Sequence, residues 1–107
     1  MGFRLPPVSI TVSGGTGSAV LSDSRGLQGR CITRGITPPS ASPSATYSWY
    51  VQDQYGGIPD SNSGVGRQNW DGEKAYVGLM TFYITGASDD GVYTLDLWFS
   101  EDHLNHY

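Results

Sequence analysis

The chain has 107 residues, of which 37% are hydrophobic and 12% aromatic, and its formal net charge is −4. A chain of this length forms one domain, and its apolar fraction is too high for intrinsic disorder, so residues 1–107 are expected to fold around a single core. The acidic balance provides no basic surface for nucleic acid, which is therefore not expected as a partner.

The charges are unevenly distributed along the chain. Residues 1–50 hold four arginines against one aspartate, whereas residues 51–107 hold two basic side chains against nine acidic ones. Because unlike patches steer encounters, this asymmetry favours docking of two copies in antiparallel orientation. Unevenly scattered solubility charges explain it equally well, so both interpretations stay open.

The single cysteine cannot form a disulfide within the chain, so the cysteine count does not indicate a cellular compartment. No apolar run approaches the roughly 20 residues that a membrane-spanning helix needs. Residues 1–7 show no leader pattern. Any membrane attachment is therefore expected to run through segments absent from this chain.

The predicted strands begin near the amino terminus. Val8–Val12 alternates apolar and polar residues with period two, which is typical of a half-buried strand. Two short edge strands are expected inside the turn-rich segment 53–73, and the proline-rich residues 38–43 are expected to cross between sheets. The other predicted strands lie at residues 18–21, 27–34, 46–52, 75–85 and 92–99.

No segment shows the 3.6-residue apolar period of an amphipathic helix. About seven to nine short strands, separated by turns every 8–12 residues, predict an all-β fold, a two-sheet antiparallel sandwich. The 15 glycines and 6 prolines supply the turns that such a fold needs.

The segment Asp89-Asp90-Gly91-Val92-Tyr93 has the Asp-x-Gly-x-Tyr pattern of a strand-to-strand corner. With Cys31 and Trp49 upstream, it resembles the immunoglobulin superfamily, in particular its variable-type domains, and Leu95 stands where the second disulfide cysteine is expected. The resemblance implies that the Tyr93 ring enters the core and its hydroxyl bonds back to the corner backbone. It also implies a structural core without a disulfide, made of Cys31, Trp49, Asp89, Tyr93 and Leu95, in which Trp49 packs against the thiol and the leucine.

The same resemblance places the strand of Trp49 beside the strand of Tyr93 in one sheet. Because side chains alternate between the two faces of a strand, the sequence neighbours of these core residues point outward. The outward group on the two strands is Tyr50, Gln52, Asp96 and Trp98. Tyr and Trp are enriched in interface hot spots, so this group is predicted to bind a protein partner. The alternative, that a loop of the chain itself or a last strand at residues 101–107 covers Trp98, stays open.

Thiol and zinc chemistry are both disfavoured by the sequence. Cys31 is predicted to lie beneath Trp49, where a reactive thiolate is not expected. His103 and His106 lack a third ligand at a firm spacing.

Two acidic patterns are also better explained by structure than by chemistry. Asp60-x-Asn62-x-Gly64 resembles the start of a calcium loop, but Val65 stands where that loop needs glycine. Asp89 and Asp90 are adjacent and so point to opposite faces, which disfavours an acid–base pair. No enzyme activity, metal or cofactor is therefore expected.

The resemblance implies a membrane-distal domain of a longer cell-surface receptor, placed on the extracellular side and binding another protein. The chain is similar in overall character to amino-terminal domains of the allorecognition receptors of colonial hydroids, which bind like copies on opposing cells. Homophilic recognition between cells is therefore the expected function. Two alternatives stay open: a carbohydrate-binding β-sandwich, in which Tyr50, Trp70 and Trp98 stack on sugar rings, and a phage or viral immunoglobulin-like decoration domain.

Overall fold

The computed structural model of the protein describes residues 2–4, 6–21 and 27–100. Within these ranges the chain forms nine strands and no helix, which confirms the all-β prediction. The strands are β1 (Gly2–Arg4), β2 (Val8–Val12), β3 (Gly17–Val20), β4 (Leu27–Thr37), β5 (Thr46–Asp53), β6 (Asp60–Val65), β7 (Gln68–Gly78), β8 (Met80–Thr85) and β9 (Gly91–Ser100). The predicted last strand at residues 101–107, with His103 and His106, lies outside the described residues.

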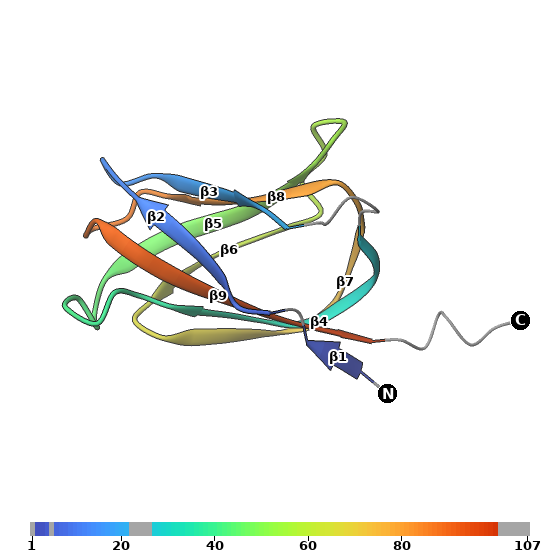
Figure 1. The fold of residues 1–107 in the computed structure, drawn as a ribbon, viewed down its shortest axis with the longest axis horizontal. Helices are drawn as coiled ribbons and strands as arrows, with labels where there is room; N and C mark the ends of the chain where they lie inside the picture. Colours follow the sequence, from blue (N-terminus) through green and yellow to red (C-terminus); the bar gives the residue numbers. More distant parts are fainter. Residues whose placement is uncertain (1, 5, 22–26, 101–107) are drawn as a thin grey trace, which may run out of the picture.

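The strands form two antiparallel sheets packed face to face (Figure 1). One sheet has four strands in the order β3-β8-β5-β6. The other has five, in the order β1-β9-β4-β7, with β2 also paired to β9. β1 and β2 lie one after the other along β9, since Arg4 of β1 pairs with Trp98 and Val8 of β2 pairs with Leu95. The two-sheet antiparallel sandwich is thus confirmed.

The strand pairings are nested along the chain. β5 pairs with β6, β4 with β7, β3 with β8, and β2 with β9. The chain therefore forms one long hairpin, with its tip between β5 and β6, and successive pairs of strands fall alternately into the two sheets. This rolled-up hairpin is the arrangement of a jelly roll.

The predicted variable-type strand order is not the one observed. The strands of Trp49 and Tyr93, β5 and β9, were expected side by side, but they lie in opposite sheets. Cys31 on β4 instead pairs directly with Phe99 of β9, and Leu95 lies opposite Ile36. Leu95 therefore does not occupy the position of a missing disulfide partner. The reason is that a corner motif determines local backbone geometry, whereas strand order is decided by long-range pairing.

The inner faces of both sheets supply one continuous apolar core. Trp49 is at its centre, stacked on Phe82 at 5.0 Å between ring centroids and meeting Trp70 edge-on at 5.3 Å. Trp49 thus makes ring contacts with Phe82 and Trp70, and it shares the core with Cys31 and Leu95. The buried hydrophobic residues include Ile10, Val12, Cys31, Ile36, Tyr47, Trp49, Val51, Trp70, Tyr76, Met80, Phe82, Ile84, Tyr93, Leu95, Leu97 and Phe99.

The corner before β9 has the predicted tyrosine geometry. Tyr93 is fully buried and its hydroxyl donates to the Asp89 carbonyl oxygen at 2.8 Å. Asp89 itself is exposed, and its carboxylate accepts from the Ser88 hydroxyl. The prediction that Asp89 belongs to the core is therefore wrong. The carboxylate of Asp90 accepts from the backbone amides of Gly14 and Gly15, which anchors the β2–β3 turn.

Replacing Tyr93 with phenylalanine is expected to lower the free energy of unfolding by about 1 kcal/mol, because the Asp89 carbonyl loses its buried donor. Urea unfolding followed by tryptophan fluorescence measures the change. Tyr55→Phe is the matched control, since Tyr55 is 88% exposed at the β5–β6 hairpin tip and its hydroxyl faces solvent. Equal midpoints for the two variants would contradict a stabilising role for the corner.

Candidate functional site: the outer face of the four-stranded sheet

The four predicted partner-binding residues lie on opposite sides of the molecule. Tyr50 and Gln52 are on β5 in the four-stranded sheet, and Asp96 and Trp98 are on β9 in the five-stranded sheet. Their outward orientation agrees with the alternation of burial along both strands, and Trp98 is 43% exposed. The prediction of one combined patch is wrong, because the core separates the two sheets.

Among the described residues of β3, β5, β6 and β8, none of the side chains on the outer face of the four-stranded sheet is charged. Strand register and alternating burial define this hydroxyl face, which is dominated by serine, threonine and tyrosine. The chain as a whole has 6 basic and 10 acidic residues, so the lack of charge on these strands does not simply reflect an uncharged sequence. Its members are Ser18, Val20, Thr46, Ser48, Tyr50, Gln52, Ser61, Ser63, Val65, Thr81, Tyr83 and Thr85.

Two tyrosines stack at the centre of the hydroxyl face. Tyr50 and Tyr83 pair directly across β5 and β8, with ring centroids 4.7 Å apart and planes 15° apart. Ser18 on β3 and Ser61 on β6 complete the same row at either side. Both rings are half-buried, so each presents a rigid aromatic surface to a binding partner.

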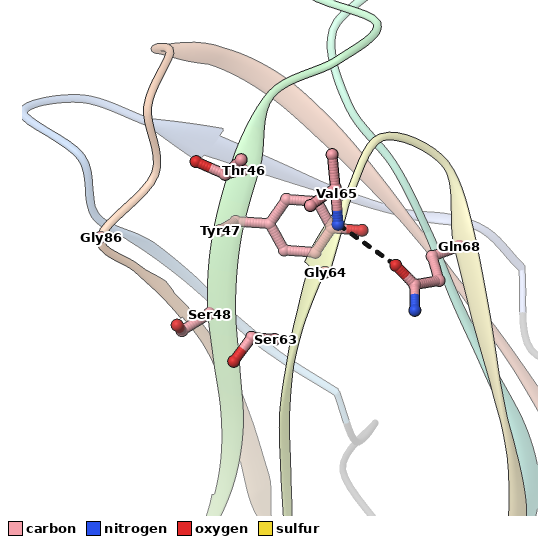
Figure 2. A pocket seen from close by; sticks show the side chains of 8 residues that line it. All are labelled: Thr46, Tyr47, Ser48, Ser63, Gly64, Val65, Gln68 and Gly86. Carbon is pink, nitrogen blue, oxygen red and sulfur yellow. Dashed lines mark hydrogen bonds between the residues drawn. The ribbon is translucent and has the colours of Figure 1, made fainter.

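A shallow hollow of about 490 Å³ lies at one end of the hydroxyl face (Figure 2). Ser48 and Thr46 of β5 and Ser63 of β6 contribute hydroxyls to its lining. Gln68 reaches in from β7, and its side-chain oxygen accepts from the Val65 backbone amide at 3.2 Å. The hollow is thus lined by neutral hydrogen-bonding groups, which suit a polar, uncharged contact rather than an ionic one.

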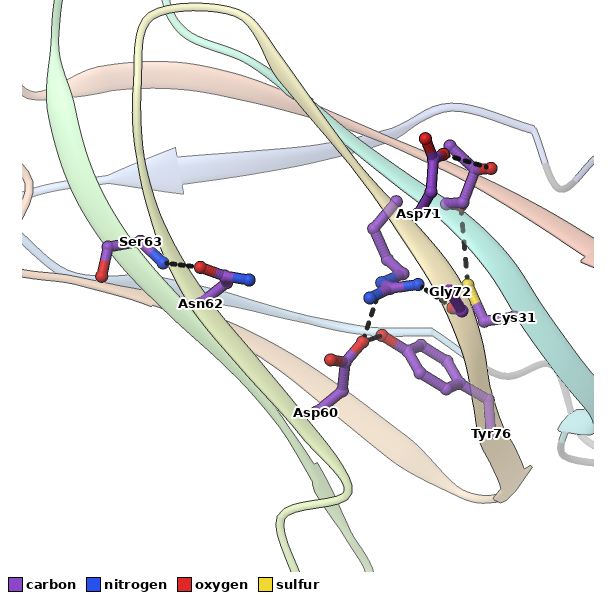
Figure 3. A network of polar contacts seen from close by, with 9 residues as sticks. Cys31, Asp60, Asn62, Ser63, Asp71, Gly72 and Tyr76 are labelled. Carbon is purple, nitrogen blue, oxygen red and sulfur yellow. Dashed lines mark hydrogen bonds and ion pairs between the residues drawn. The ribbon is translucent and has the colours of Figure 1, made fainter.

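The buried polar groups of the protein form a structural cluster between the sheets (Figure 3). Arg34 of β4 and Asp60 of β6 are 2% and 5% exposed, and Arg34 Nε lies 2.9 Å from Asp60 Oδ2. The hydroxyl of Tyr76 donates to the same carboxylate oxygen at 2.7 Å, and Arg34 Nη1 donates to the Gly72 carbonyl. The Arg34 Nε–H itself meets no hydrogen-bond geometry, so its contact with Asp60 is an ion pair only.

This cluster joins β4 and β7 of one sheet to β6 of the other. Asp60 opens the segment that resembles a calcium loop, but its carboxylate is already occupied by Arg34 and Tyr76 inside the core. Among the residues that the structure describes, no group of three metal-ligating side chains is found. The cluster therefore serves the fold and offers no open coordination site.

Cys31 lies beside this cluster and is fully buried. Burial, the largest effect, raises the pKa of its thiol to about 12, while the nearby Arg34 guanidinium acts in the opposite direction. A thiol with this pKa is protonated at neutral pH and cannot act as a nucleophile. The thiol donates weakly to the Thr33 carbonyl at 3.6 Å, which agrees with its predicted structural role.

Comparison with known proteins identifies no family for the chain. No family model matches the sequence, and no curated protein matches it. One solved structure, the enzymatically active domain of tailspike protein 4 from bacteriophage CBA120, is similar over 87% of this chain at 15% identity, with a TM-score of 0.36. The match covers 15% of the tailspike chain. A TM-score of this size does not establish a shared fold.

No helix that is long and apolar enough to cross a membrane occurs among residues 2–4, 6–21 and 27–100.

Proposed function

We propose that the domain is a non-catalytic recognition module that binds another protein through the hydroxyl face. The observation that carries the proposal is the absence of charge among the outward side chains of the four described strands, around the stacked Tyr50 and Tyr83. Depletion of charged residues and enrichment of aromatic ones distinguish the cores of protein interfaces from ordinary surface.

The physical reason is the cost of removing polar groups from water. A charged side chain that is buried without a partner is strongly destabilising, whereas a hydroxyl regains its hydrogen bonds by rotating toward a new acceptor or donor. Tyrosine adds a large contact area and loses little conformational entropy, and the combination of tyrosine and serine is typical of antibody paratopes. The hydroxyl face has this composition.

The dimensions of the face indicate a weak contact. Four strands about 4.8 Å apart, with the eight-residue β5 among them, cover roughly 500 Å². Stable complexes bury about 800 Å² on each partner, so this face alone supports a transient interface. The exposed Tyr55 at the tip of the β5–β6 hairpin, which protrudes beyond the sheets in Figure 1, extends the surface available for contact.

We take a second copy of the domain on an opposing cell as the partner. A two-fold contact requires one self-complementary face, and an uncharged face avoids the like-charge repulsion that two acidic chains otherwise encounter. Weak contacts of this kind become effective when many copies are displayed together, because linked binding events raise the avidity. A place on the extracellular side of the cell surface belongs to the same proposal.

The test introduces one charge into the face. The purified domain is expected to self-associate in sedimentation velocity with a Kd of about 100 µM to 1 mM, and coated beads are expected to aggregate. Ser48→Arg should weaken association at least tenfold, because its guanidinium loses water in the contact. Thr11→Arg, on an exposed position of β2 in the other sheet, is the matched control and should behave as the wild type.

A wild-type domain that stays monomeric over this range, with beads that stay dispersed, would overturn the homophilic proposal. Equal association of the Ser48→Arg and wild-type proteins would show that any self-contact uses a different surface.

A further inference from the structure

The outer face of the five-stranded sheet contains a small polar dimple of a different kind. It has a volume of about 140 Å³ and is lined by Thr33, Gly35, Arg67, Asn69, Asp96 and Trp98. Two of these residues lie on β4, two on β9 and one on β7, and Arg67 directly precedes β7. The dimple thus lies on the side of the molecule opposite the hydroxyl face.

The floor of the dimple exists because position 35 is glycine. Gly35 pairs with Asp96 on one side and with Asn69 on the other, so it is the centre of a row of three outward positions. A Cβ atom at Gly35 would come within 2.5 Å of the Asn69 side-chain oxygen. The missing side chain therefore leaves room above the sheet, and the Asn69 amide occupies part of it.

One wall of the dimple is the Trp98 side chain, which is 43% exposed. Trp98 pairs with Thr33 in the next row along the sheet, and the Thr33 hydroxyl donates to Asp71 at 3.0 Å. An exposed indole ring offers a flat apolar surface beside polar groups. An aromatic wall with a few convergent polar groups is the usual composition of a small-ligand site.

The polar lining carries both signs of charge and both hydrogen-bonding senses. Arg67 donates, and its Nη1 lies 3.4 Å from the Asn69 side-chain oxygen; Asp96 accepts. A hydroxyl is a neutral group that can donate to a carboxylate and accept from a guanidinium at the same time. An anionic ligand would meet the charge of Asp96, and a cationic one would meet Arg67.

We propose that this dimple binds a single neutral sugar ring, with its C–H face on Trp98 and its hydroxyls on Arg67, Asn69 and Asp96. A volume of about 140 Å³ is well below the ~300 Å³ of the smallest ordinary ligand pockets, so one ring enters and the rest of a glycan stays in solvent. The buried Trp70 and the Tyr50 of the opposite sheet take no part, in contrast to the prediction that both join Trp98 in stacking.

The experiment is a titration of the ¹⁵N-labelled domain with D-glucose, D-galactose, D-mannose and N-acetyl-D-glucosamine. The domain has three tryptophans, so three indole N–H signals are expected, and Trp98→Phe identifies one of them by its loss. At least one sugar should shift the Trp98 signal saturably, with a Kd in the millimolar range, as a small ligand on an open site requires. The signal of the buried Trp70 should stay in place.

Two variants test the geometry. Gly35→Ala narrows the floor and displaces the Asn69 amide, since the new Cβ would lie 2.5 Å from its oxygen, so the variant should weaken sugar binding at least tenfold. Trp98→Ala should do the same. Thr37→Ala, two residues further along β4 and outside the dimple, should bind as the wild type. The spectra themselves report whether each variant is folded.

The proposal is overturned if none of the four sugars shifts the Trp98 signal, or if Gly35→Ala binds as the wild type. It is also overturned if inorganic phosphate, choline or N-acetyl-lysine methylamide binds more tightly than every sugar, because the site then selects a charge or a peptide side chain. Ser48→Arg should leave sugar binding unchanged, so the result is independent of the hydroxyl face.

Discussion

Replacing Asp60 with asparagine is expected to lower the free energy of unfolding by about 3 to 5 kcal/mol, the usual cost of removing one partner from a buried ion pair. The change keeps the shape of the side chain but leaves the Arg34 guanidinium, 2% exposed, without a counter-charge in the core. It also weakens the acceptor of the Tyr76 hydroxyl. Urea unfolding at neutral pH, followed by tryptophan fluorescence, measures the loss.

The matched control is Asp71→Asn, because the Asp71 carboxylate is exposed and accepts one hydrogen bond from Thr33. That variant should cost about 1 kcal/mol or less. The triple variant Arg34→Met, Asp60→Leu, Tyr76→Phe should recover most of the stability, since apolar groups of similar size commonly replace a buried ion pair without loss. Similar stabilities for Asp60→Asn and Asp71→Asn would contradict the role of the cluster.

Alkaline pH is expected to destabilise the protein from about pH 9 upward. Burial raises the pKa of Cys31 from 9.0 to about 12, so the folded state holds the thiol proton in a range where the unfolded state releases it. The stabilisation that Cys31 provides as a buried thiol is therefore intact below pH 9 and is lost as the pH rises toward 12, and the loss is about 1 kcal/mol by pH 10. Burial also raises the pKa of Tyr47, from 10.0 to about 12, which extends the loss above pH 10.

Stability curves at pH 7, 9 and 10 measure this effect, with Cys31→Ala as the comparison. The variant is less stable at pH 7 because it leaves a small cavity, but its stability should fall less between pH 9 and 10 than that of the wild type. The thiol of the folded wild type should also resist alkylation by iodoacetamide at pH 8 until urea unfolds the chain. Parallel pH profiles, or rapid alkylation of the folded protein, would show that Cys31 is not held as a buried thiol.

The sequence predicted most of the strands because their side chains alternate in polarity. β2, β5 and β9 lie within one residue or so of their predicted limits at residues 8–12, 46–52 and 92–99. The long β-prone run 75–85 was taken as one strand, but the chain turns at Leu79, which ends β7 and lets β8 begin in the other sheet. A turn that contains no proline and joins two β-prone segments cannot be recognised from the polarity pattern alone.

Only part of the candidate site could be predicted from the sequence. Alternation correctly pointed Tyr50, Gln52, Asp96 and Trp98 away from the core. It did not identify Tyr83, although the alternation of Thr81, Tyr83 and Thr85 with buried residues, and the lack of charge on that side of the strand, were visible signals. Tyr83 lies beside Tyr50 because β8 pairs with β5. The polarity pattern of each strand does not indicate which other strand it pairs with.

The sequence by itself determined the all-β class, the inward and outward faces of most strands, and the tyrosine corner, in which Tyr93 bonds to Asp89 only four residues away. These properties follow from period-two geometry and from short-range contacts. Only the tertiary structure decided the jelly-roll order, the uncharged hydroxyl face and the Gly35 dimple. Each of these depends on pairing between strands distant in the chain, and a pattern along one strand does not specify which other strand lies beside it.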